Sequence, residues 1–225
     1  MKEHPILFSA PMIRALLYGR KTQTRRAVKP VGNDGGFVLI ENASRLWPYR
    51  SDDGESSFHT VKRGGNEYLD ETPHECPYGR PGDRLWVRES WRAPTSCDHL
   101  PPRSISDSEA VRFIADETVG ADAGFGKGRP GMFMPRWASR IDLEITAVRV
   151  ERLQDISEQD AKAEGADGLV TETCTEDDKA LLDLPLYSAD PHRNGYALLW
   201  ESLNGDGSWA ENLWVWVVEF KRVAA

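Results

Sequence analysis

The segment Gly19-Arg20-Lys21-Thr22-Gln23-Thr24-Arg25-Arg26 places cations and hydroxyl groups side by side. The wider window from Arg14 to Lys29 contains six cations and no acid, whereas the whole chain has a formal net charge of −8. A protein that is acidic overall and concentrates its cations around small hydroxyl residues is expected to hold one anionic or polar ligand in one place. This segment is therefore the first candidate for a functional site.

The composition narrows the classes of function. With 225 residues the chain can fold as one large domain with a hydrophobic core. The net charge of −8 argues against a partner such as duplex DNA, because proteins that bind duplex DNA need a broad basic face. No apolar stretch is long enough for a signal peptide or a membrane span, and three cysteines are typical of a reducing compartment. We therefore expect a cytoplasmic protein.

Hydrophobic periodicity predicts strands that recur from the beginning to the end of the chain, with helices between them. Strands are expected at about 6–8, 84–89, 141–150 and 214–220. Helices are expected at about 9–19, 157–164 and 196–203. The alternation of strands and helices predicts an α+β fold.

Three polar stretches interrupt this pattern and are expected to be long loop insertions in a single domain that spans residues 1–225. They lie at about 31–75, 93–131 and 170–191. The second insertion ends in a glycine-rich run at 124–131, which lacks the closing Lys-Ser/Thr of a phosphate-binding loop and follows no strong strand. We therefore expect no nucleotide cofactor.

The Gly-Arg-Lys-Thr-Gln-Thr-Arg run that follows the first helix resembles a motif of the ASCH domain family, whose members have a PUA-like fold. Three further segments, at 81–89, 153–165 and 216–221, are similar to the family and occur in its order. Together the four segments cover roughly half of the chain. The chain resembles the longer phage- or prophage-encoded members, because compact members lack much of the three insertions.

This resemblance implies a small PUA-like mixed β-barrel with flanking helices, a cleft for RNA or a nucleoside, and a bacterial or phage setting. Compact bacterial members are amidohydrolases that remove the acetyl group from N4-acetylcytidine. Their catalytic set is a lysine, a threonine and a glutamate, and the matching positions here are Lys21, Thr24 and Glu164. The implied function is hydrolysis of N4-acetylcytidine or a related N4-acylated nucleoside, without a cofactor or a metal.

The chemistry of amide hydrolysis suits these three residue types. Thr24 supplies a hydroxyl nucleophile, and a neutral Lys21 takes its proton; neighbouring cations favour that neutral state because they lower the lysine pKa. Glu164 is expected to orient the lysine, relay a proton or bond the cytosine amino edge. An arginine or a backbone N–H faces the developing oxyanion. Residues expected to bind the substrate are Arg20, Arg25, Arg26, Glu89, Trp91 and Arg136.

Two other interpretations of the sequence stay open. The same basic segment suits a non-catalytic RNA-binding module, or a ribonuclease in which the lysine and arginines stabilise a phosphorane. A zinc site is a weaker interpretation, because the candidate ligands match no standard spacing and free thiols are the default; these ligands are His74, Cys76, Cys97, His99 and Cys174. The expected partner is a modified nucleoside or RNA and no membrane, and the oligomeric state is unknown from the sequence.

Overall fold

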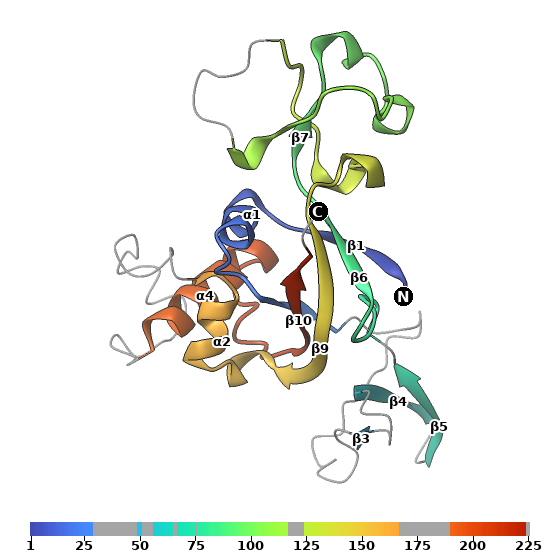
Figure 1. Cartoon of the computed structure of the whole chain (residues 1–225). Coiled ribbons are helices and arrows are strands. Elements are labelled where there is room, and N and C mark those ends of the chain that lie inside the picture. The colour runs from blue at the N-terminus through green and yellow to red at the C-terminus, as the bar shows by residue number, and fades with distance from the viewer. Residues whose placement is uncertain are drawn as a thin grey trace.

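The computed structural model describes residues 1–28, 49–50, 56–64, 67–74, 76–116, 124–166 and 190–223. It confirms the expected α+β class, with a mixed five-stranded sheet at its centre (Figure 1). The strand order is β1-β6-β9-β10-β2, where β1 pairs in parallel with β6 and all other neighbours are antiparallel. These strands are β1 (Glu3–Leu7), β2 (Gln23–Ala27), β6 (Arg84–Arg88), β9 (Asp142–Arg152) and β10 (Trp214–Arg222).

The two edge strands of this sheet, β1 and β2, approach each other at one end. Arg26 in β2 donates a hydrogen bond from Nη2 to the backbone oxygen of Leu7 in β1, over 2.8 Å. No backbone ladder joins the two edges within the described ranges. The sheet is therefore curved but open there, whereas the resemblance to PUA-like proteins implies a barrel.

Helices pack against both faces of the long strand β10. Alternate side chains of a strand point to opposite faces. Trp216 and Val218 accordingly pack into the core that contains α1 (Ala10–Leu17), and Val215 and Val217 pack into the core that contains α4 (Pro191–Asn204). The short helix α2 (Glu158–Ala163) follows η6 (Leu153–Asp155) and contributes Ala161 to the second core. Burial on both faces explains the continuous apolar run of β10.

The second predicted insertion forms a small lobe with its own core, at the top of Figure 1. Strands β7 (Trp91–Arg92) and β8 (Arg112–Phe113) pair in this lobe, and its buried apolar side chains include Trp91, Ile105 and Met134. Its short 3₁₀ helices are η1 (Thr95–Cys97), η2 (Pro102–Ser104), η3 (Ile114–Asp116), η4 (Gly131–Phe133) and η5 (Arg136–Ala138). The lobe is thus a folded unit, and it reaches beyond both ends of the predicted insertion.

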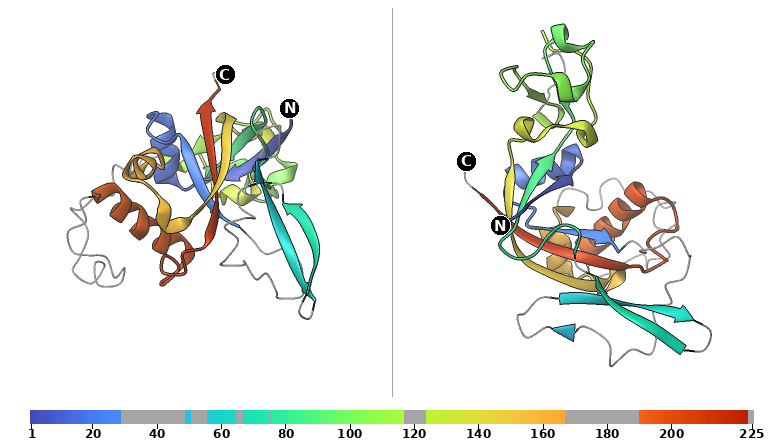
Figure 2. Two further views of the ribbon diagram at one scale, coloured as in Figure 1. Left: turned by 90° about the horizontal axis from the view of Figure 1, so that it is seen from below. Right: turned by 90° about the vertical axis from the view of Figure 1, so that its right-hand side faces the viewer.

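The first predicted insertion contains a second sheet, which projects from the body of the molecule (Figure 2). Its strand order is β3-β4-β5, with β3 (Tyr49–Arg50), β4 (Ser56–Gly64) and β5 (Glu67–His74) in antiparallel pairing. The third insertion lies outside the described residues, apart from its last two residues at the start of α4. In the part of the chain that the structure describes, no helix combines the length and apolar character that a membrane crossing needs.

Candidate active site

The end of α1 fixes the position of Lys21. Gly19 adopts a φ of +71°, a conformation that glycine tolerates and other residues rarely adopt. The chain then turns so that the backbone N–H groups of Arg20 and Lys21 both donate to the oxygen of Ala15, over 2.9 and 3.1 Å. Lys21 therefore stands between the last turn of α1 and the first residue of β2.

Helix α2 brings Glu164 to the same place. Its N-cap is the one that the sequence predicts, because the Ser157 hydroxyl accepts a hydrogen bond from the backbone N–H of Asp160 over 3.0 Å. The helix ends at Glu164, and the next residue, Gly165, has a φ of +85°. A Cβ on Gly165 would lie 3.3 Å from the Cβ of Lys21, so this glycine permits the close approach of the two segments.

Lys21 and Glu164 form a buried ion pair. The Lys21 Nζ donates to Glu164 Oε2 and to the Glu164 backbone oxygen, both over 2.8 Å, and the two side chains are 0% and 2% exposed. The Nζ also lies 5.4 Å from the ring centre of Phe8. Burial lowers the pKa of Lys21, and the charge of Glu164 opposes this effect only in part. A neutral lysine is therefore available at lower pH than for an exposed lysine.

Arg25 holds the carboxylates that surround this pair. Its Nη2 donates to Glu151 over 2.8 Å and to Asp160 over 3.1 Å, and its Nη1 donates to Glu164 over 3.4 Å. The side chain is fully buried. Because all three partners are carboxylates, Arg25 positions Glu164 and its charge is balanced within the protein. Arg25 also lines the cavity, and its expected contact with a substrate stays a prediction.

Thr24 lies outside the hydrogen bonds of Lys21 and Glu164. It pairs with Val218 across the β2–β10 ladder, whereas Arg25 pairs with Val217, so the two side chains point to opposite faces of the sheet. The Thr24 hydroxyl is fully buried and has no hydrogen-bond partner among the described residues. The structure therefore brings together two of the three expected catalytic residues and leaves the third unpartnered.

A cavity of about 490 Å³ opens beside the ion pair, between β2, α4 and the lobe. The charged residues that line the cavity are Glu164, Arg25 and Arg26. Lys21 is not among the lining residues, but it contacts two residues that are, Glu164 and Phe8. Tyr196 also lines the cavity, and burial together with the charge of Glu164 raises its pKa well above the usual value, so the phenol stays neutral. The volume is typical of small-molecule sites.

The remaining two arginines of the motif differ in position. Arg26 lines the cavity and donates to the backbone oxygens of Arg25 and Leu7 over 3.2 and 2.8 Å. Arg20 is exposed, with its guanidinium 5.9 Å from the ring centre of Tyr18, and it is not among the cavity-lining residues. Arg26 is therefore the better placed of the two for contact with a ligand.

Three expected substrate-binding residues from other segments are engaged elsewhere, which corrects those predictions. Trp91 is 0% exposed and packs edge-on against Trp137, so it offers no face for stacking on a base. Arg136 pairs with Glu3 over 3.0 Å and with Asp142 over 3.0 Å, away from the cavity lining. The core of the lobe surrounds Trp91, and local ion pairs hold Arg136.

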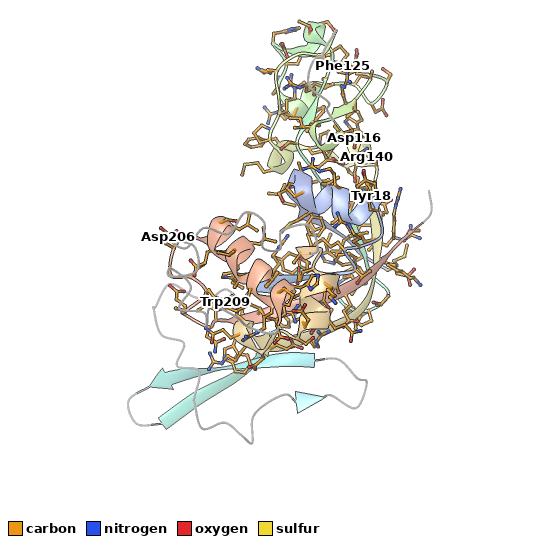
Figure 3. The ribbon with its side chains drawn as sticks, turned by 90° about the vertical axis from the view of Figure 1, so that its left-hand side faces the viewer. Tyr18, Asp116, Phe125, Arg140, Asp206 and Trp209 are labelled. Atoms are coloured by element: carbon orange, nitrogen blue, oxygen red, sulfur yellow. The ribbon has the colours of Figure 1, made fainter. Side chains whose placement is uncertain are left out.

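Glu89 is buried at the base of the lobe and binds Arg140, with distances of 2.9 and 3.0 Å to Nε and Nη2. Burial raises the pKa of Glu89, and Arg140 opposes that effect. Arg140 also pairs with Asp116, beside it in Figure 3. Glu89 is therefore a structural partner of Arg140 and not a ligand of the cavity.

Replacing Arg140 with methionine should lower the unfolding free energy by about 2–3 kcal/mol near neutral pH, because it leaves the buried Glu89 carboxylate without its hydrogen-bond donors. The loss should shrink at acid pH. Since burial raises the pKa of Glu89, its carboxyl group becomes neutral at higher pH than usual and then needs no cation. Urea denaturation at neutral and acid pH measures both effects. An equal loss of unfolding free energy at the two pH values would contradict the role of Arg140 as the partner of the Glu89 carboxylate.

Sequence reasoning missed the residues that build the cavity wall. The pattern at 196–203 predicts a helix face, but it gives no sign that Tyr196, Leu199 and Trp200 border a cavity together with Met132 from the lobe.

Among the described residues, no group of three His, Cys, Asp or Glu side chains is arranged to hold a metal ion. Burial raises the pKa of the Cys76 thiol to about 11, so this thiol stays protonated.

No protein-family model, curated protein or solved structure matches this chain. The resemblance of the basic motif to the ASCH family therefore rests on its residues alone. Function is inferred from the geometry of the site.

Proposed function

We propose that this protein is an amidohydrolase of ASCH type that removes the acyl group from N4-acetylcytidine or a related N4-acylated nucleoside. The observation that supports this most strongly is the buried Lys21–Glu164 pair beside the cavity, with both Nζ contacts at 2.8 Å. A lysine whose pKa is lowered by burial is suited to accept a proton at moderate pH. Amide hydrolysis needs such a base.

In the proposed reaction, the Thr24 oxygen attacks the acyl carbon and its proton passes to neutral Lys21. The Arg26 guanidinium, which lines the cavity, faces the oxyanion of the tetrahedral intermediate. The C–N bond then breaks, and the exocyclic nitrogen receives the proton from Lys21 through Glu164. Water hydrolyses the acyl-Thr24 ester, releases the carboxylic acid and restores the hydroxyl. Glu164 suits this relay because it lies between Lys21 and the cavity.

Attack by Thr24 requires its hydroxyl to move within reach of Lys21 when the substrate binds. The hydroxyl has no hydrogen-bond partner within the described residues, so such a movement breaks no hydrogen bond. Catalytic hydrogen bonds are often absent or long in ligand-free enzymes and form in the substrate complex. The unpartnered hydroxyl is thus compatible with the proposal.

The charges around the cavity favour a nucleoside-sized ligand over an RNA strand. Several arginines of the described residues are paired with carboxylates, which leaves less positive charge for phosphates; they include Arg25, Arg129, Arg136, Arg140 and Arg149. The chain as a whole has a net charge of −8. RNA binding depends on a cluster of free cations. These charges therefore favour a nucleoside hydrolase over the non-catalytic RNA-binding module that the sequence leaves open.

The test is to incubate the protein with N4-acetylcytidine and measure cytidine and acetate by liquid chromatography. We expect release by the wild type, and a loss of about 10²–10⁴-fold in turnover for Lys21→Met, which removes the base. Lys162→Met is the matched control, because Lys162 is exposed and lies on α2 two residues before Glu164. Wild-type turnover in folded Lys21→Met would contradict the proposal, and so would the absence of cytidine with the wild type.

A further inference from the structure

The cavity has an unusually apolar mouth. Leu7, Met132 and Leu203 line it although they are 50%, 58% and 51% exposed. They come from three separate segments: the end of β1, the lobe and the last turn of α4. Among the described residues, six large apolar side chains are at least 50% exposed, and three of them line this mouth. Clustered exposed apolar groups indicate a surface that a ligand covers.

The apolar lining continues from the mouth toward the ion pair. Met12, Leu199 and Trp200 line the wall and are buried or half-buried, and the buried charged side chains of Glu164 and Arg25 line it as well. Arg26 is half-buried and lies beside the mouth, because its Nη2 donates to the Leu7 backbone oxygen over 2.8 Å. A ribose is a poor occupant for this wall, because its hydroxyl groups would lose water without gaining hydrogen bonds. The wall suits a hydrocarbon group that starts at the reacting carbonyl.

The lining also contains polar groups that can bond the sugar. Ser9, Ser90 and Asn204 line the cavity in addition to the apolar residues. Hydroxyl and amide side chains of this kind can exchange hydrogen bonds with ribose hydroxyls. The cavity therefore offers partners to both halves of an acylated nucleoside, the polar sugar and the apolar acyl group.

We infer that the substrate is acylated with an apolar group larger than acetyl, such as a medium-length alkanoyl or an aroyl group. This inference rests on the proposed function, because it places the scissile carbonyl beside Glu164 and Lys21. The acyl group extends along Leu199 and Trp200 to the mouth formed by Leu7, Met132 and Leu203. An acetyl group would leave this mouth uncovered.

The expected effect is a preference that grows with chain length. Burial of one methylene group corresponds to about a fourfold gain in affinity. We therefore expect kcat/KM to rise by about fourfold per added methylene until the chain reaches the mouth. The gain should appear mainly in KM, because the added contacts lie far from the reacting atoms and are the same in the ground and transition states.

The experiment measures kcat/KM for N4-acetyl-, N4-butanoyl-, N4-hexanoyl- and N4-benzoylcytidine. Leu203→Asn is expected to weaken the rise along the series, with a larger loss for hexanoyl than for acetyl. Leu213→Asn is the matched control, because Leu213 is also exposed, at 38%, and is not among the cavity-lining residues. It should reproduce the wild-type series.

The outcomes separate the inference from the proposed function. If acetylcytidine is hydrolysed but kcat/KM stays flat or falls with longer acyl groups, the inference is wrong and the proposed function stands. An equal effect of Leu203→Asn on all four substrates would also overturn the inference. If the folded wild type hydrolyses none of the four, the proposed function fails and the inference fails with it.

Discussion

Replacing Thr24 with valine is expected to lower kcat/KM for an N4-acylated cytidine by on the order of 10⁴-fold or more, as removal of a nucleophile does in other acyl-transfer enzymes. The unfolding free energy should stay the same or rise slightly. The Thr24 hydroxyl is fully buried and has no hydrogen-bond partner among the described residues, so a methyl group in its place breaks no hydrogen bond. Steady-state kinetics and urea denaturation measure the two quantities.

The sequence offers a matched control two residues earlier. Thr22 is exposed, and Thr22→Val makes the same chemical change in the same motif. It should leave both turnover and stability close to the wild type. If Thr24→Val kept its activity while Lys21→Met lost it, water rather than Thr24 would be the nucleophile. A large loss of stability in Thr24→Val would show that the hydroxyl has a partner in solution.

Replacing Arg25 with leucine should lower the unfolding free energy by about 3–5 kcal/mol, because it removes one partner of a buried ionic cluster. The guanidinium is fully buried and contacts Glu151, Asp160 and Glu164, and Glu164 is itself only 2% exposed. We also expect a loss of activity, since Arg25 fixes the carboxylate that bonds Lys21. Chemical denaturation of both proteins at neutral pH measures the first effect.

The same variant has a predicted pH dependence. Burial raises the pKa of Asp160, but Arg25 and Arg149 outweigh burial and lower it overall. The stabilisation from this pair is therefore present above the unfolded-state pKa and is lost as the pH falls through the lower, folded-state pKa. The difference in unfolding free energy between the wild type and Arg25→Leu should therefore become smaller at acid pH.

Arg152 provides the control for the loss of an arginine from the same sheet. Its guanidinium lies 4.3 Å from the Trp214 ring centre and donates to the backbone oxygen of Asn212. Among the described residues no carboxylate pairs with it. Arg152→Leu should lower the unfolding free energy by only about 1 kcal/mol. An equal loss in the two variants would mean that the carboxylate cluster adds no special stability.

Local signals in the sequence predict most helices and strands of the central fold. The apolar alternation near 141–150 and the run at 214–220 correspond to β9 and β10, and the Ser157 cap begins α2. Strand β2 was not predicted, because Gln23, Thr24 and Arg25 lack an apolar alternation. Arg25 bonds carboxylates of β9 and α2, and the Gln23 amide donates to the backbone oxygen of Asp160. These partners are distant in sequence.

The site was predictable only in part, for the same reason. The motif and its resemblance point to Lys21 and Glu164, and the structure places these two in contact. The structural role of Arg25 depends on three acidic residues far along the chain, and local sequence does not reveal these pairings. Trp91 was a candidate for stacking because it lies beside an arginine at a strand end. Its burial could not be predicted, since the apolar residues of the lobe have no helical or strand periodicity.

The pH dependence of kcat/KM, measured for the wild type and Glu164→Gln, tests most directly whether Lys21 is the base. Activity should rise with pH as Lys21 loses its proton, with a midpoint below the ordinary lysine value of 10.5 because burial lowers its pKa. Glu164 opposes that shift, so Glu164→Gln should move the midpoint to still lower pH. An identical midpoint in both proteins, or a shift to higher pH in the variant, would contradict the role of the Lys21–Glu164 pair.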